Sequence, residues 1–445
     1  MASNRLSRWT PLIFLFALVN FLAAQWLILA GFAWPAQAIS APGTLVAVHL
    51  LTIGWLMLLM FGALFQFVPV ITSSPLVGQR LALAGLIAIQ GGLIGMICGF
   101  LGISGGFPGH GLALPAGGAA VLAGVLIASW NIGVPLVRAK DRTLPGRMVL
   151  TGLAFLLLTV VLGLSLALAL TIPALAPRLG PLLGGVGDHA LAGLGGWLTL
   201  SAIGVSYKLL PMFMLAPEER GVTGDCVHVL GAAGFGTAVA AGLAQIWIPA
   251  GALRIAETAG DLAIVLAIAL YLWDVVGIYR TRKRAAIEAH NRAAVAAFGF
   301  LGLAAALALG SLVTGTLADR SPLLVFVVVF GWLGGLGLTQ LYKIVPFLAW
   351  LGRYGKSLGR GLVPRVQDLV DESRGYPWFA IYFLAVLLAA TSAFAGRPSA
   401  FRASLMISAL ATCGLALEYW RAWRGYYVRR RDTPSTPPFL PNQRG

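Results

Sequence analysis

The chain has few charged residues and few cysteines, and both shortages narrow the kind of protein it can be. Charged residues make up 10% of its 445 residues, whereas hydrophobic residues make up 59%. A soluble globular domain carries about 25% charged residues, so this composition argues against a soluble protein. The three cysteines, Cys98, Cys226 and Cys413, share no local spacing, which argues against a disulfide framework or a zinc site.

The chain also lacks the short motifs of enzymes that use soluble cofactors. It contains no P-loop, no dinucleotide-binding fingerprint, no haem-attachment Cys-x-x-Cys-His and no nucleophile triad signature. We therefore do not expect an enzyme of these classes.

The sequence does contain twelve long apolar stretches. A helix that crosses a bilayer needs about 20 mostly apolar residues, and the stretches do not alternate as barrel strands would. We therefore predict an all-α, multi-pass protein of a bacterial-type inner (cytoplasmic) membrane, with the lipid bilayer as its surroundings. The predicted spans are 11–33, 44–72, 80–102, 112–137, 148–171, 188–215, 226–250, 256–279, 293–314, 322–350, 377–396 and 403–423.

The net charge of +16 does not indicate a nucleic-acid partner, because the basic residues are distributed as in a membrane protein. Most of the 31 Lys and Arg lie on the side of the termini, and the opposite loops hold only Arg178, Arg254, Arg320, Arg397 and Arg402. The positive-inside rule therefore predicts that both termini are cytoplasmic. We expect the basic loop 351–376 on the inner membrane surface and a disordered cytoplasmic tail over 424–445.

One motif occurs three times, as Gly54-Trp55-Leu56, Gly196-Trp197-Leu198 and Gly331-Trp332-Leu333. Each copy is followed at the same distance by a proline, namely Pro69, Pro211 or Pro346. The copies lie roughly 140 residues apart. We therefore predict one transmembrane domain, 1–445, built from internal repeats at 11–137, 148–279 and 293–423. Each repeat then has four helices, and the motif falls on spans two, six and ten.

Polar side chains inside the spans are candidate functional groups, because an unpaired polar group in hydrocarbon is costly. One set occupies the same repeat position before each proline: Gln66, Lys208 and Lys343. The two lysines either snorkel to the inner surface, which we prefer, or line a proton or anion path with Asp274 and Glu418. Glu257 and Asp261 lie one turn apart. They either hold a cation or share a proton, or they pair with Arg254, which we prefer.

The strongest cofactor candidate is His49, near the start of span two. One helical stripe from it carries Leu56, Met60 and Phe67, which suit the walls of a pocket for a flat apolar ligand such as a porphyrin. The alternative is a histidine that is hydrogen-bonded to a neighbouring helix.

The other histidines are weaker candidates. His189 follows Asp188, a carboxylate that either orients a metal-binding imidazole or caps the helix, and we favour the cap. His110 lies in an outer loop and is a weak metal candidate. We expect His228 and His290 to be solvated or interfacial.

Taken together, these features resemble subunit I of the haem-copper oxidase superfamily, which includes cytochrome c and quinol oxidases and bacterial nitric-oxide reductases. The resemblance rests on twelve spans, cytoplasmic termini, and a histidine early in span two that is followed by Gly-Trp-Leu and a late proline. It implies three pseudo-threefold-related four-helix arcs. It also implies that His49 is an axial ligand of a low-spin haem and that His189 matches the span-six ligand of the active-site copper.

The chain departs from that family at most of its metal ligands. Span ten, where the family has its other haem ligands, contains no histidine, and the positions matching His49 are Leu191 and Phe326. The family's His-His pair near the outer end of span seven is replaced by GLAQIWIPAG. We therefore do not expect a competent oxygen or nitric-oxide reductase.

Three functions remain open from the sequence. The first is a haem-binding protein with haem b and without copper, acting in electron transfer, sensing or support of a respiratory complex. Its partners would be respiratory subunits or a cytochrome c-type donor, and His49 and His189 would be its ligands. The second is a transporter or assembly factor for copper, haem or a small solute that has kept the fold without the cofactor. The third is a structural subunit.

Overall fold

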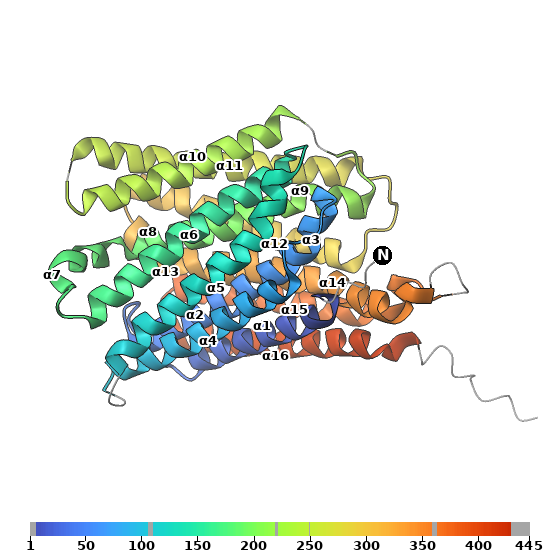
Figure 1. Ribbon diagram of the computed structural model, residues 1–445, viewed down its shortest axis with the longest axis horizontal. Helices are drawn as coiled ribbons and strands as arrows, with labels where there is room; N and C mark the ends of the chain where they lie inside the picture. The colour runs from blue at the N-terminus through green and yellow to red at the C-terminus, as the bar shows by residue number, and fades with distance from the viewer. Residues whose placement is uncertain (1–5, 106–109, 219–220, 249, 358–362, 429–445) are drawn as a thin grey trace, which may run out of the picture.

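The computed structural model describes residues 6–105, 110–218, 221–248, 250–357 and 363–428. Over these residues the chain is all-helical, and twelve helices are long and apolar enough to cross a membrane, as predicted. They lie side by side in a bundle, and α1 starts at the same end at which α16 finishes, on the right in Figure 1. The cytoplasmic location of that end stays a prediction. Most of the predicted disordered tail, 429–445, lies outside the described residues.

Nine of the spans are single helices, and three change helix type along their length. The single helices are α1 (Leu6–Leu29), α4 (Gln79–Ile103), α5 (His110–Arg138), α6 (Leu144–Thr171), α10 (Val222–Gln245), α11 (Gly251–Thr281), α12 (Ala289–Thr314), α15 (Glu372–Phe394) and α16 (Pro398–Arg424). Span two comprises α2 (Pro42–His49), η1 (Leu50–Met57) and α3 (Leu58–Thr72).

Spans six and ten are composite in the same way. Span six comprises α7 (Ala176–Leu179), η2 (Gly180–Gly185), α8 (Val186–Ala190), η3 (Leu191–Thr199) and α9 (Leu200–Met214). Span ten comprises α13 (Leu317–Phe326), η4 (Val327–Gly334) and α14 (Gly335–Tyr354). The short 3₁₀ helices η5 (Gly355–Ser357) and η6 (Val366–Leu369) precede α15.

The three copies of the Gly-Trp-Leu motif all lie in π-helical segments, namely η1, η3 and η4. π-Helices are rare, and those that occur are frequently found at functional sites. The three segments contact one another at the centre of the bundle. The threefold repeat seen in the sequence is therefore also a repeat of an unusual backbone conformation.

The glycine of each motif copy allows a close approach to another helix. A Cβ atom on Gly54 would lie 2.7 Å from the Asn20 side chain of α1. On Gly196 and Gly331 it would overlap the rings of Phe155 in α6 and Phe300 in α12. Small residues permit such contacts between membrane helices. Each motif span thus packs in the same way on the first helix of its predicted repeat.

The spans pack in three series, and each series contains one motif span. The first series is α15, α16, α1 and span two; the second is α4, α5, α6 and span six; the third is α10, α11, α12 and span ten. Each series ends with the second span of a predicted sequence repeat and begins two spans before that repeat. The boundaries of the repeats stay a prediction.

Candidate functional site

Phe326 of span ten stands at the repeat position that His49 occupies in span two. Aromatic side chains pack around it, between spans ten and twelve. The ring centroid of Phe326 lies 4.7 Å from that of Phe330 and 5.3 Å from that of Phe401. Trp34, in the loop after α1, lies 6.3 Å from Phe326 and 5.6 Å from Phe401. These centroid distances are those of directly packed rings.

The same packing continues into spans one and two. Phe21 of α1 lies 5.6 Å from Phe330 and stacks on Trp55 at 4.9 Å. We call these six side chains the aromatic cluster: Trp34, Phe326, Phe330, Phe401, Phe21 and Trp55. All except Trp34 are buried. The cluster occupies the space between span two and span ten, so a porphyrin held between these spans does not fit there.

His49 faces another part of the bundle. Its Nδ1–H donates to the carbonyl oxygen of Leu45 at 2.7 Å, and its ring packs on Phe100 of α4 with centroids 5.0 Å apart. Met60 and Phe67, the expected pocket walls, lie in α3, which follows η1. Met60 is half-buried and Phe67 is buried. The stripe that joined them to His49 assumed α-helical spacing, and the intervening π-helix changes that spacing.

His189 has the same hydrogen-bonding arrangement as His49. Its Nδ1–H donates to the carbonyl oxygen of Thr159 in α6 at 3.0 Å, and its ring lies against Gly163. The two imidazoles come from spans two and six, and each lies just before the π-helical segment of its span. With Nδ1 protonated, each neutral imidazole keeps the lone pair of Nε2 for a metal or a donor.

Asp188 is not the helix cap that we expected. The helix α8 begins at Val186, so Asp188 lies inside the first turn, and the cap position, Gly185, has no capping side chain. The Asp188 carboxylate instead lies against Gly242 of α10, where a Cβ atom would overlap it.

The carboxylates Asp188 of span six and Glu257 of span eight both reach the C-terminal part of α10. Glu257 accepts a hydrogen bond from Gln245 Nε2 at 2.6 Å. The ion pairs found among the described residues do not include the expected partner Arg254.

Metal ligation by three or more side chains is not found in the described part of the chain. Its His, Cys, Asp and Glu residues form no group of three placed to hold a metal ion, and its three cysteines are free. His110 is the first residue of α5, and its side chain lies outside the described residues. A metal held by His49 and His189 would thus have no third His, Cys, Asp or Glu ligand from the described residues.

The repeat-equivalent polar residues each reach a neighbouring segment at one end of the bundle. Gln66 Nε2 donates to Thr10 Oγ1 at 2.9 Å. Lys208 pairs with Glu218, and Lys343 Nζ lies 2.5 Å from Glu288 Oε2. Both lysines thus end at carboxylates outside the spans, which agrees with snorkelling.

The buried carboxylates Asp274 and Glu418 are held locally. Tyr207 donates its hydroxyl to Asp274 Oδ2 at 2.7 Å. Glu418 pairs with Arg421 at 2.5 Å and accepts a hydrogen bond from Tyr427. Buried charges paired in this way contribute to architecture and do not by themselves indicate a path.

His290 is buried, whereas we expected it to be solvated or interfacial. Only 2% of its side chain is exposed, its Nδ1 lies 3.4 Å from Glu288 Oε2, and its ring meets the ring of Phe213 edge-on at 5.1 Å. Burial alone would raise the pKa of Glu288. The hydrogen bond and charge of Lys343, with the nearby His290 and Arg284, outweigh burial and hold this pKa below its usual value. His228, by comparison, is half-buried, with Nε2 2.9 Å from Thr151 Oγ1.

Two groups were missed from the sequence. Tyr207 precedes Lys208 in the repeat and holds Asp274. Thr199 lies at the end of η3, and its hydroxyl donates to the carbonyl oxygen of Leu194 at 2.8 Å. A hydroxyl directly after Gly-Trp-Leu, which the other two copies lack, was the available signal for Thr199.

Comparisons with known proteins show a likeness of fold alone. No protein-family model matches the chain, and no curated protein matches it. A cryo-EM structure of a dimeric heme-copper terminal oxidase is similar, with a TM-score of 0.58 and 10% sequence identity, over 97% of this chain and 84% of that chain. The chain therefore has a haem-copper oxidase subunit I-like fold, as the resemblance implied.

Proposed function

We propose that this protein is an oxidase-fold membrane protein that works without the family's low-spin haem, as a transporter or an assembly factor. The observation that supports this proposal is the aromatic cluster. Phe326 stands in span ten at the repeat position of His49 and is packed by Phe330, Phe401 and Trp34. We further propose a bacterial-type inner membrane as its location and respiratory subunits as its partners.

A second candidate function is binding of haem b as a resident cofactor by His49 and His189. It is supported by the matched hydrogen bonds from Nδ1 to the carbonyls of Leu45 and Thr159, which leave both Nε2 atoms available. Such a ligand would lie beside spans three and five and not at the family's span-two and span-ten position. In this reading the protein acts in electron transfer or sensing.

One experiment separates the two candidates. The detergent-purified protein, expressed with ample haem, is examined by a reduced-minus-oxidised visible spectrum, and haem and metals are quantified per chain. The same measurements are made on His49→Ala and His189→Ala, with His228→Ala as a matched control because it lies at the other end of the bundle.

The first candidate predicts no Soret band. About one haem per chain that is lost in both variants and kept in the control would overturn it and support the second. A metal ion that is lost in both variants, without haem, would identify the cargo of a transporter or assembly factor. Uptake into proteoliposomes then separates these two roles.

A further inference from the structure

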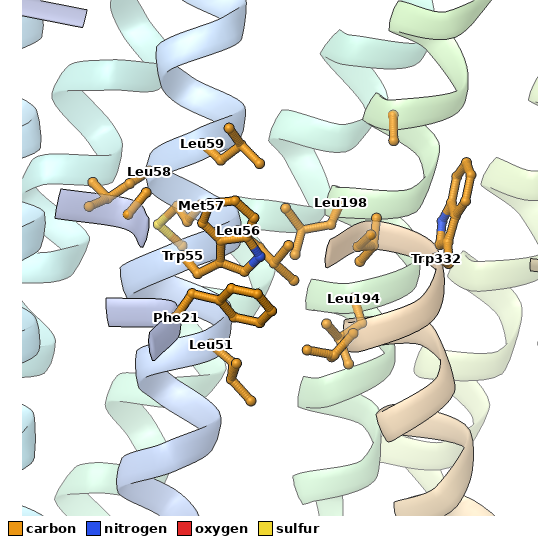
Figure 2. Close-up of a cluster of buried hydrophobic side chains, with 14 of the residues drawn as sticks. Phe21, Leu51, Trp55, Leu56, Met57, Leu58, Leu59, Leu194, Leu198 and Trp332 are labelled. Atoms are coloured by element: carbon orange, nitrogen blue, oxygen red, sulfur yellow. The ribbon is translucent and has the colours of Figure 1, made fainter. Parts of the chain in front are cut away.

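The centre of the bundle is built from three π-helical turns. η1, η3 and η4 contact one another pairwise. In Figure 2 the side chains of Leu56, Leu194 and Leu198 lie between Trp55 and Trp332 and fill the centre. Leu56 and Leu198 are both 3% exposed. The centre is therefore closed by apolar side chains of the motif spans.

Two of the π turns are stabilised at the same repeat position by different means. The Thr199 hydroxyl donates to the carbonyl oxygen of Leu194, five residues earlier. At the matching place in span ten, a Cβ atom on Gly334 would lie 2.5 Å from the carbonyl oxygen of Val329, also five residues earlier. A π-helix brings a residue close to the carbonyl five positions back, whereas an α-helix brings it close to the one four back. Threonine in one copy and glycine in another thus accommodate the π turn.

The tryptophans of the π turns share one unusual feature. Trp55, Trp197 and Trp332 are at most 1% exposed, and among the residues that the structure describes the buried indole N–H of each has no hydrogen-bond partner. A buried indole usually finds a partner, and an unmet donor costs free energy. All three copies therefore keep the same unfavourable feature, and an unsatisfied buried group of this kind can be a reservoir of strain.

We propose that the three π turns form a gate at the centre of the bundle, which opens when a π turn converts to α-helical hydrogen bonding. Such a conversion displaces the hydrogen-bond register by one residue, which turns one half of the span relative to the other by about 100°. Opening removes the leucines and the motif tryptophan from the centre. The gate deepens the proposed transport role and rests on it.

The candidate ligand groups lie where this movement begins. His49 immediately precedes η1, and His189 lies two residues before η3. Conversion of either π turn turns the segment that carries its histidine. A small ligand held by these imidazoles is thereby brought to the central passage when it opens.

The test is the labelling rate of a cysteine at the centre by a membrane-impermeant methanethiosulfonate. In a chain with Cys98, Cys226 and Cys413 replaced by alanine, Leu198→Cys reports on the gate. Val125→Cys is the control because it is fully buried in α5, away from the motif. Thr199→Val replaces the hydroxyl with a methyl group of similar size, and Gly334→Ala crowds the Val329 carbonyl, so both disfavour the π turn.

We expect each of these variants to raise the labelling rate at Leu198→Cys by about tenfold without changing it at Val125→Cys. Thr199→Ser keeps the hydroxyl and should keep the original rate. The gate proposal is overturned if the labelling rate rises equally at both cysteines. It is also overturned if neither variant changes the labelling rate at Leu198→Cys. Labelling needs no substrate, so a rejected gate leaves the haem and uptake experiments to decide the proposed function separately.

Discussion

Lys343 of span ten places its ammonium nitrogen 2.5 Å from a carboxylate oxygen of Glu288, which directly precedes α12. Arg284 pairs with the same carboxylate, and His290 lies 3.4 Å from it. Glu288 therefore joins the loop between spans eight and nine to the C-terminal half of span ten, and only 11% of its side chain is exposed.

Glu288→Gln should destabilise the protein by about 2 kcal/mol at pH 7, since charge-assisted hydrogen bonds contribute about this much. The matched control is Lys208→Met. Its pair with Glu218 is more exposed, at 31% and 48%, so the loss should be below about 1 kcal/mol. Unfolding in detergent measures both. Equal losses in the two variants would contradict the importance assigned to Glu288.

The contribution of Glu288 should also depend on pH. Its pKa in the folded protein is held below its usual value of 4.5. A lowered folded-state pKa stabilises the protein fully above the unfolded value, and this stabilisation is lost as pH falls through the folded-state pKa. The stability difference between wild type and Glu288→Gln should therefore narrow below pH 4.5. A difference that stays constant down to the acid unfolding limit would argue against this assignment.

Gly331→Ala should destabilise the protein by about 1–3 kcal/mol, the usual cost of overpacking. The added methyl group would overlap the Phe300 ring of α12. Gly299→Ala, in α12 itself, is the control because nothing lies within 4 Å of its added Cβ. That variant should be neutral or more stable. The contrast is measured by unfolding midpoints, and a tolerated Gly331→Ala would rule out the close helix contact.

Phe326→Ala should cost about 3–5 kcal/mol, because it leaves a cavity in the aromatic cluster. Phe394→Ala is the control, since Phe394 is 55% exposed and its loss should have little effect on packing. A cost below about 1 kcal/mol for Phe326→Ala would mean that the cluster is loosely packed. That result would reopen the space between spans two and ten for a cofactor.

Tyr207→Phe should cost about 1–3 kcal/mol, because the buried Asp274 carboxylate then loses the donor at 2.7 Å. A double-mutant cycle with Asp274→Asn measures the coupling. Additive effects of the two substitutions would show that the hydrogen bond does not contribute to stability.

The sequence predicted the spans well because the length of an apolar stretch is visible in composition. The predicted span 44–72 corresponds to Pro42–Thr72, whereas span six, predicted from 188, begins its helical course at Ala176. The π turns were not predicted, since a change of one residue in hydrogen-bond register leaves no mark in hydrophobicity. The burial of His290 was missed for a different reason. It depends on Phe213 and Lys343, which lie far away in the sequence.

The three motif copies lie on one polypeptide, which distinguishes this chain from a symmetric trimer with the same centre. In a trimer, any substitution at the axis appears three times, so a position must serve all subunits at once. Here Asn20, Phe155 and Phe300 meet equivalent glycines, and Met57, Thr199 and Gly334 end equivalent π turns. The copies are therefore free to specialise independently, so that one position can hold a histidine in one copy and a phenylalanine in another while the scaffold stays the same.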